Sequence, residues 1–169
     1  MVNLDDLPFP AYDLIDFNAY LDSPYLYKSR SAIPEKSISI ITSRGCPFDC
    51  TFCSIELHMG KRFRYHSPDY VIRHLLLCIE KMGIRKFHFE DDNISQNKKR
   101  FEEILDKIIE NNLQINWDTP NGIRADTLDF KITTLGNEGM DFNVLGLMYK
   151  IYVGKMQLRR YNENYKNNL

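Results

Sequence analysis

The sequence lacks a long hydrophobic segment and an excess of charge of either sign. Its 169 residues carry 22 Lys and Arg against 23 Asp and Glu, which gives a formal net charge of −1. This balance provides no general electrostatic attraction to nucleic acid or to an anionic membrane, so we expect neither as a partner. No apolar run approaches the roughly 20 residues that a transmembrane helix requires.

The first residues do not resemble a secretory leader, so we expect none. Residues 1–10 are acidic and contain two prolines, whereas a signal peptide has a basic start followed by an apolar run. Cysteine is scarce, with four in the chain. Without a leader, these cysteines are expected to be reduced thiols and not disulfides. The sequence therefore predicts a cytoplasmic protein whose thiols are available to a metal.

Three of the four cysteines are grouped within eight residues. Cys46, Cys50 and Cys53 have the spacing Cx3Cx2C in a loop that also contains Gly45 and Pro47. Thiolates spaced so closely can converge on one inorganic centre. Structural zinc sites and ferredoxin clusters normally use four protein ligands, so three cysteines leave one position open for another ligand. A zinc site completed by a distant ligand and a set of buried structural thiols are the alternatives.

The three cysteines, with the aromatic residue Phe52 directly before the third, resemble the signature of the radical S-adenosylmethionine (SAM) superfamily. The resemblance implies that Cys46, Cys50 and Cys53 hold a [4Fe–4S] cluster whose fourth iron binds the amino and carboxylate groups of SAM. One electron from the reduced cluster would then cleave the sulfonium to methionine and a 5′-deoxyadenosyl radical. Phe52 would pack on the cluster and the adenine; a plain core phenylalanine is the alternative.

Strand-like and helix-like patterns alternate after the first 36 residues. The apolar patterns predict four strands, at 37–42, 85–90, 113–119 and 140–147. Helical patterns lie between them, at 67–83, 101–112 and, more weakly, 128–135. This alternation predicts an α/β fold, namely a partial (βα) barrel of parallel strands with outer helices, comprising roughly the first four βα units of a radical SAM barrel.

The chain divides into three predicted segments. Residues 1–36 are rich in tyrosine and proline without a sustained period, so we expect an arm that packs aromatic side chains on a neighbour. Its phrase Asp6-Leu7-Pro8-Phe9-Pro10 resembles the connector that precedes the barrel in the cobalamin-binding branch of the superfamily, and an ordinary N-terminal arm is the alternative. Residues 37–148 form the predicted partial core, and residues 149–169 form a divergent basic tail.

Three acidic residues lie at the end of the second predicted strand, at the sheet edge where parallel α/β proteins bind ligands. Phe89-Glu90-Asp91-Asp92 resembles a Phe-x-Asp-Asp phrase of the cobalamin-binding branch. The resemblance implies that at least one of Glu90, Asp91 and Asp92 contacts SAM, whose ammonium and sulfonium suit carboxylates. Carboxylates favoured only by the dipole of the following helix are the alternative. The cysteine loop and the turn 121–126 also follow predicted strands, so all three segments are expected to meet.

Arg124 lies in the turn Asn121-Gly122-Ile123-Arg124-Ala125-Asp126, which resembles the third-strand turn of the same branch. The resemblance implies that its guanidinium pairs with a carboxylate, either that of SAM or that of an acidic neighbour. A surface pair with Asp126 is the alternative. His88 shares a strand face with Glu90 and is expected to be a buried, hydrogen-bonded histidine. The sequence identifies no catalytic acid, base or nucleophile.

Together these patterns predict a radical SAM enzyme that uses a [4Fe–4S] cluster, SAM and a reductant such as flavodoxin or ferredoxin. The expected reaction is methyl transfer, cyclisation or another C–H functionalisation of an unidentified small molecule. The resemblance also implies cobalamin, held by a domain absent from this chain. The family pattern fades after about residue 135, so we expect a truncated core. A non-catalytic iron–sulfur module for electron transfer or sensing and a zinc-bound structural domain are the alternative functions.

Overall fold

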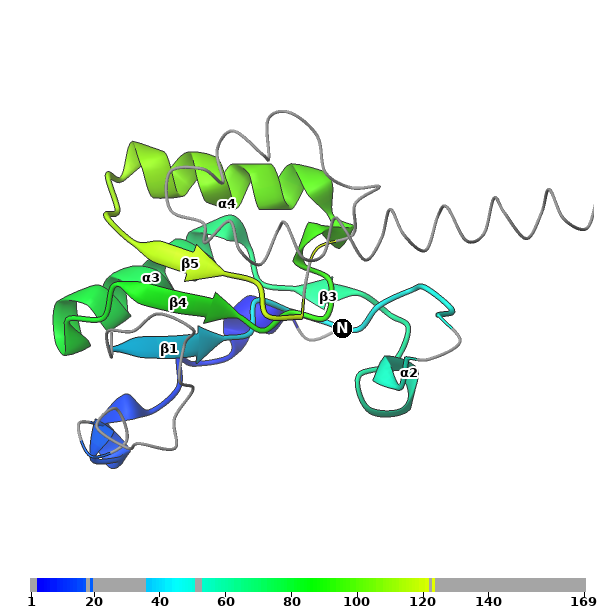
Figure 1. The fold of residues 1–169 in the computed structure, drawn as a ribbon, viewed down its shortest axis with the longest axis horizontal. Helices are drawn as coiled ribbons and strands as arrows, with labels where there is room; N and C mark the ends of the chain where they lie inside the picture. Colours follow the sequence, from blue (N-terminus) through cyan, green and yellow to red (C-terminus); the bar gives the residue numbers. More distant parts are fainter. Residues whose placement is uncertain (1–2, 18, 20–35, 51–52, 122, 124–169) are drawn as a thin grey trace, which may run out of the picture.

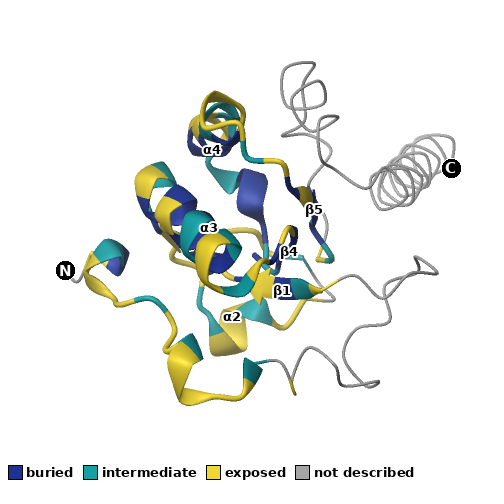
Figure 2. Cartoon of the chain, turned by 90° about the vertical axis from the view of Figure 1, so that its left-hand side faces the viewer, coloured by how far each residue is buried: buried dark blue, intermediate teal, exposed yellow. Residues whose placement is uncertain are grey.

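The computed structural model describes residues 3–17, 19, 36–50, 53–121 and 123. Within this part, three strands form a parallel sheet of order β1-β4-β5. The strands are β1 (Ser37–Ile40), β4 (Lys86–Phe89) and β5 (Asn116–Asp118). The helices α3 (Pro68–Met82) and α4 (Lys98–Glu110) lie together on one face of the sheet (Figures 1 and 2).

Parallel pairing of the three strands confirms the predicted α/β class. Ile38 pairs with Phe87, and Phe87 pairs with Trp117, so large apolar side chains form one layer across the sheet. The predicted third helix, at 128–135, and the predicted fourth strand, at 140–147, lie outside the described residues. The partial barrel of four units therefore stays a prediction.

The boundaries of α3 follow from local chemistry that the sequence predicted. The Ser67 hydroxyl accepts a hydrogen bond from the Tyr70 N–H at 3.1 Å, and Pro68 occupies the first turn, where no N–H is needed. At the other end, Gly83 has a φ of +66°, and its N–H donates to the Ile79 carbonyl at 3.0 Å. This left-handed cap ends the helix.

The hydrophobic core lies between the sheet and the two helices (Figure 2). Trp117 packs edge-on against Phe89 and Phe101, with ring centroids 5.8 and 6.1 Å apart. Cys78 is fully buried in this core. All four residues of β4 are buried, which differs from simple alternation, because β4 is the central strand of the described sheet.

The N-terminal arm packs on α3, as its aromatic content predicted. It contains two short 3₁₀ turns that the sequence did not predict, η1 (Leu4–Asp6) and η2 (Tyr12–Leu14). The Phe9 ring stacks on His74 with centroids 5.1 Å apart, and the Tyr12 hydroxyl lies 2.9 Å from His74 Nε2. Among the described residues, no helix is long and apolar enough to cross a membrane.

His74 makes the docking of this arm sensitive to acid. Burial, with a smaller effect of His66, lowers the pKa of His74 to about 4. An unfolded chain binds this proton below a pH of about 6.5, whereas the folded chain binds it only near pH 4, so stability is lost as the pH falls between these values. At about 1.4 kcal/mol per pH unit, the loss approaches ~3 kcal/mol at pH 4.

We therefore expect the urea midpoint to fall between pH 7 and pH 4.5, and to fall less in His74→Gln. Exposed His58 supplies the control, because His58→Gln should retain the parent profile. Identical pH profiles for the parent protein and His74→Gln would contradict this assignment.

Candidate functional site

The segments that follow β1, β4 and β5 meet at one edge of the sheet (Figure 1). After β4, the Asp91 carboxylate accepts hydrogen bonds from the Thr42 N–H at 3.2 Å and the Thr42 hydroxyl at 2.9 Å, and a short one from the Ser43 hydroxyl. After β5, the Asn121 side-chain amide donates to the Glu90 carbonyl at 3.1 Å. The structure thus joins the residues directly after the three strands, whereas of the predicted turn 121–126 only Asn121 and Ile123 are described.

The three acidic residues have different surroundings. Asp91 is only 1% exposed. Burial raises the pKa of its carboxyl, while the hydrogen bonds from Ser43 and Thr42 and the charge of Arg100 act in the opposite direction. Glu90 and Asp92 are half-buried, and the Ser39 hydroxyl donates to Glu90 at 3.3 Å. Asp91 therefore serves to join the strand ends, and Glu90 and Asp92 are the more accessible carboxylates.

Arg100 is a buried part of the site that sequence reasoning missed. This α4 residue is 3% exposed, and its guanidinium donates to the His66 carbonyl at 2.7 Å and the Thr42 carbonyl at 3.0 Å. Burial lowers its pKa, and Asp91 opposes that shift most strongly. The available signal was helical spacing, because Arg100 lies four residues before the buried Ile104 on the same helix face.

A short antiparallel ribbon that the sequence did not predict carries the start of the cysteine loop. Its strands are β2 (Ser43–Arg44) and β3 (Arg64–Tyr65), joined through the short helix α2 (Ile55–His58). The Cys46 N–H donates to the Gly60 carbonyl at 3.2 Å, which closes the loop beyond the ribbon. The local order of Cys46 therefore depends on the pairing of β2 and β3.

Gly45 permits this closure. Its φ is +84°, and a Cβ at this position would collide with the Arg62 carbonyl oxygen and lie 2.8 Å from that of Gly60. Left-handed backbone alone costs a residue with a side chain about 1–2 kcal/mol, and the collision adds to that cost. Gly45→Ala should therefore open the loop and lower the iron bound after anaerobic reconstitution by half or more, while the thermal midpoint changes little.

The matched control for this prediction is Gly60→Ala. Gly60 also has a positive φ, of +76°, but its Cβ position has no neighbour within 4 Å. Gly60→Ala therefore bears the cost of a left-handed backbone without the collision, so its iron content should fall less than that of Gly45→Ala. Equal iron in Gly45→Ala and the parent protein would contradict the role given to Gly45.

The three predicted cysteine ligands are free thiols on this loop. Cys46 and Cys50 are half-buried, and Cys53 is exposed. Among the described residues, no three His, Cys, Asp or Glu side chains are arranged to hold one metal ion. The donor set nevertheless fits an iron–sulfur cluster by its chemistry, since thiolates are the ligands of such clusters. Phe52 and Arg124 lie outside the described residues, so their predicted roles are untested.

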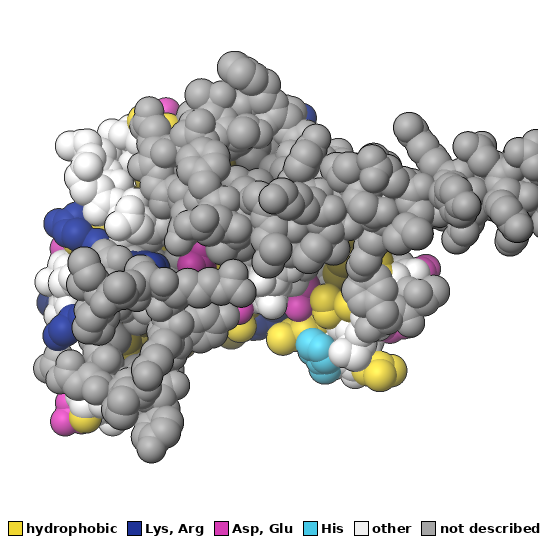
Figure 3. Space-filling model, in the orientation of Figure 1, with side chains coloured by type: hydrophobic (Ala, Val, Ile, Leu, Met, Phe, Trp, Pro, Cys, Tyr) yellow, Lys and Arg dark blue, Asp and Glu magenta, His cyan; other side chains and the backbone are white. Residues whose placement is uncertain are grey.

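The surface beside this loop carries both ion pairs and exposed apolar side chains. Lys61 pairs with Asp49 at 2.5 Å and Glu56 at 3.5 Å, linking the two sides of the cysteine loop. Figure 3 shows hydrophobic side chains gathered at the α2 end of the molecule, where Leu57 is 89% exposed. These exposed ion pairs contribute little to stability.

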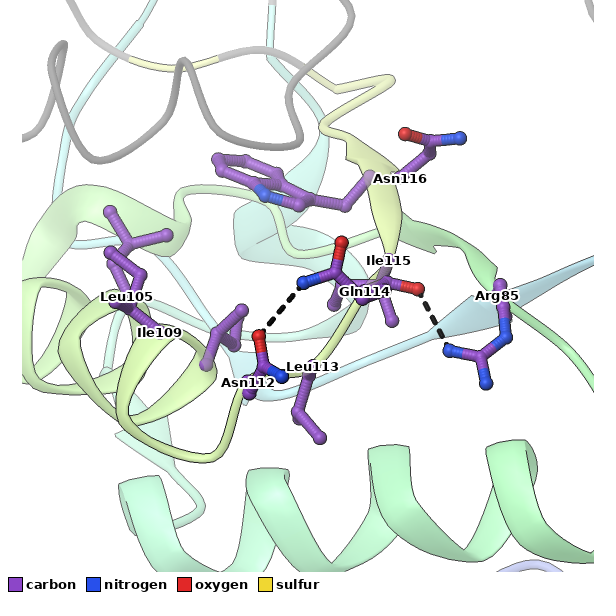
Figure 4. A pocket seen from close by; sticks show the side chains of 10 residues that line it. Arg85, Leu105, Ile109, Asn112, Leu113, Gln114, Ile115 and Asn116 are labelled. Atoms are coloured by element: carbon purple, nitrogen blue, oxygen red, sulfur yellow. Dashed lines mark hydrogen bonds between the residues drawn. The ribbon is translucent and has the colours of Figure 1, made fainter.

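A pocket of about 360 Å³ lies away from the carboxyl ends of the strands (Figure 4). It is formed by the end of α4, the segment leading into β5, and Arg85, whose side chain donates to the Gln114 carbonyl at 3.0 Å. None of the cysteines or the acidic residues 90–92 lines it. Ligands of parallel sheets bind at the opposite end of the strands, so we assign this pocket no part in the site.

Known proteins share both the sequence pattern and the fold. Residues 40–145 match the model of the Radical SAM superfamily. An uncharacterized methyltransferase of Pyrococcus horikoshii is 36% identical over 137 residues, which cover 81% of this chain and 27% of that protein. Cytidylyl-2-hydroxyethylphosphonate methyltransferase of Streptomyces wedmorensis is 30% identical over 141 residues, covering 83% of this chain and 26% of that protein. The chain thus spans about a quarter of the length of these curated relatives.

A solved structure has a similar fold. The radical SAM methyltransferase TsrM from Kitasatospora setae, with cobalamin and a [4Fe–4S] cluster bound, matches with a TM-score of 0.51 and 18% identity. The match covers 68% of this chain and 23% of that chain. At this identity the likeness concerns the arrangement of strands and helices alone.

Proposed function

This chain belongs to the radical SAM superfamily, and from that premise we propose that it binds a [4Fe–4S] cluster and SAM and cleaves SAM reductively. The observation that carries the proposal is the position of Cys46, Cys50 and Cys53. They lie in the segment that matches the family, on a loop that leaves the sheet at the carboxyl end of β1 and is preceded by Thr42 and Ser43, which bond to Asp91.

The three thiolates would hold the cluster and leave one iron open to SAM. When bound, the cluster supplies the electron that cleaves the sulfonium to methionine and a 5′-deoxyadenosyl radical. Glu90 or Asp92 would accept hydrogen bonds from the ammonium of SAM or stabilise its sulfonium; their half-buried positions at the carboxyl end of β4 support this role. Asp91 would act indirectly, by fixing Thr42 and Ser43 next to the cysteine loop.

We further propose that Phe52 packs on the cluster and the adenine, and that Arg124 pairs with a carboxylate of SAM or of a neighbour. The reaction we favour is methyl transfer to a small molecule, because two relatives and the solved structure are named methyltransferases. Ring formation or another C–H functionalisation is the second candidate. We also propose that the reaction uses cobalamin, held outside the residues of this chain, since the TsrM structure contains cobalamin. A reductant such as flavodoxin or ferredoxin would supply the electron.

Anaerobic reconstitution with iron and sulfide, followed by dithionite and SAM, tests this proposal. We expect 5′-deoxyadenosine and methionine in equal amounts by liquid chromatography and mass spectrometry. An iron-loaded protein that leaves SAM intact would favour a non-catalytic iron–sulfur module. A protein that binds zinc but no iron would favour a structural zinc domain. Either result would overturn the proposed activity.

A further inference from the structure

The ribbon that carries Cys46 is too small to be stable by itself. Its strands β2 and β3 contain two residues each and form two residue pairs, Ser43 with Tyr65 and Arg44 with Arg64. A two-stranded hairpin is marginal in water even at greater length. Both residues of β3 are exposed, so burial of β3 side chains adds little. The order of this ribbon must therefore come from the residues that hold its base.

Both chains of the ribbon are joined at their base by Arg100. Thr42 immediately precedes β2 and His66 immediately follows β3, and the His66 N–H donates to the Thr42 carbonyl at 2.9 Å. Arg100 Nη2 donates to that Thr42 carbonyl at 3.0 Å, and Nε donates to the His66 carbonyl at 2.7 Å. The guanidinium also lies over the Tyr65 ring, 5.2 Å from its centroid. One buried side chain from α4 thus contacts both sides of the ribbon.

The same base is anchored to β4 through Asp91. Its carboxylate accepts from the Thr42 N–H and hydroxyl and from the Ser43 hydroxyl. Thr42 therefore has its N–H, its hydroxyl and its carbonyl all bonded, and it is 1% exposed. Asp91 also provides an opposite charge that stabilises the buried guanidinium, since it is the strongest influence raising the pKa of Arg100.

We propose that Arg100 is a positioning residue for the iron-binding loop. Its planar fork fixes the separation of the Thr42 and His66 carbonyls, and thereby aligns β2 with β3 and Cys46 with Gly60. Lysine carries its three donors on one rotatable nitrogen and has no planar fork, so it cannot reproduce the two fixed bond directions of the guanidinium. The part of the inference that concerns iron rests on the proposed function, whereas the part that concerns the ribbon does not.

Hydrogen exchange of the metal-free chain tests the ribbon directly. In Arg100→Gln, the amides of Cys46 and His66 should exchange at least about tenfold faster, as expected for loss of hydrogen bonds from a charged donor. The amides of β4 and the second half of α3 should accelerate much less than those of Cys46 and His66. In Arg100→Lys, the exchange rates of these two ribbon amides should lie between those of Arg100→Gln and those of the parent protein. Lys99→Gln, a change at the exposed neighbour on α4, is the control and should match the parent protein.

Acceleration spread equally over the ribbon, β4 and α3 would reduce Arg100 to a general stabilising role and overturn the inference, as would no acceleration at all. Should Arg100→Gln fail to fold, Arg100→Lys carries the same comparison. The parent chain adds a third test, because rapid exchange of Cys46 and His66 without substitution would also contradict a held ribbon.

Iron loading then separates this inference from the proposed function. After reconstitution, Arg100→Gln should bind half or less of the parent iron, and its electron paramagnetic resonance (EPR) signal should be broader, because the loop adopts several arrangements. Parent protein without iron would overturn the proposed function and leave the exchange result to decide the role of Arg100. Equal iron and identical spectra in a variant with a loosened ribbon would overturn the link between Arg100 and the cluster.

Discussion

Cys46→Ala should abolish cluster binding and reduce 5′-deoxyadenosine formation to background. Only three cysteines lie on the loop, and two thiolates cannot hold a [4Fe–4S] cluster against loss of iron. The substitution leaves the Cys46 N–H bond to Gly60 and the ribbon intact, so the loss should not come from misfolding. Iron and sulfide per chain, the visible absorption of the reconstituted protein, and 5′-deoxyadenosine by mass spectrometry are the measurements.

Cys78→Ala is the matched control, because Cys78 is the fourth cysteine and is buried in the core between α3 and the sheet. It should retain the parent iron content and lose only a modest amount of stability, about 1 kcal/mol, from the small cavity. Parent-like iron in Cys46→Ala, or loss of iron in Cys78→Ala alone, would show that the three-cysteine assignment is wrong.

Asp91→Ala should lower the free energy of unfolding by about 3–5 kcal/mol, because it leaves three buried hydrogen-bond donors without their carboxylate acceptor, at about 1–3 kcal/mol each. The substitution leaves Thr42 with two buried donors, Ser43 with one, and Arg100 without its nearby opposite charge. A loss of this size is a large part of the 5–15 kcal/mol that is typical of a domain. Urea unfolding of the metal-free chain, monitored by far-ultraviolet circular dichroism, measures it.

Asp92→Ala separates a structural role from a ligand role. Asp92 is half-buried, so its removal should change the urea midpoint little. If Asp92 contacts SAM, the same variant should bind the cluster normally and require more SAM for half-maximal cleavage. Comparable destabilisation by Asp91→Ala and Asp92→Ala would contradict the distinction drawn between the two carboxylates.

Elements with local signals were predicted well from the sequence. The start of α3 follows from Ser67-Pro68 and its end from Gly83, all within the helix or beside it. β1 and β4 follow from their apolar runs, and the observed strands lie inside the predicted ones. The ribbon of β2 and β3 could not be predicted, because strands of two residues have no period, and their pairing depends on Asp91 and Arg100, which are distant in sequence.

The meeting of the strand ends was predicted from the sequence, whereas the roles of the site residues stay predictions. Parallel topology alone places the segments after β1, β4 and β5 together, and hydrogen bonds between these segments confirm it. Asp91 is buried because its carboxylate bonds to Thr42, whereas Glu90 and Asp92 stay partly exposed. Thr42 is distant in sequence, so no local pattern distinguishes the three carboxylates. Arg100 follows two exposed lysines, so the local composition suggested that its side chain would also be exposed to solvent. The fold instead buries it.

EPR of the reduced, reconstituted chain, recorded with and without SAM, tests the central claim most directly. If three cysteines hold the cluster and its fourth iron is open, the protein should contain about four irons per chain. Addition of SAM should then change the spectrum, and SAM labelled with ¹⁵N at its amino group should give a resolvable hyperfine coupling to the cluster. A reduced cluster whose spectrum is identical with and without SAM, or a chain that binds no iron, would contradict the account.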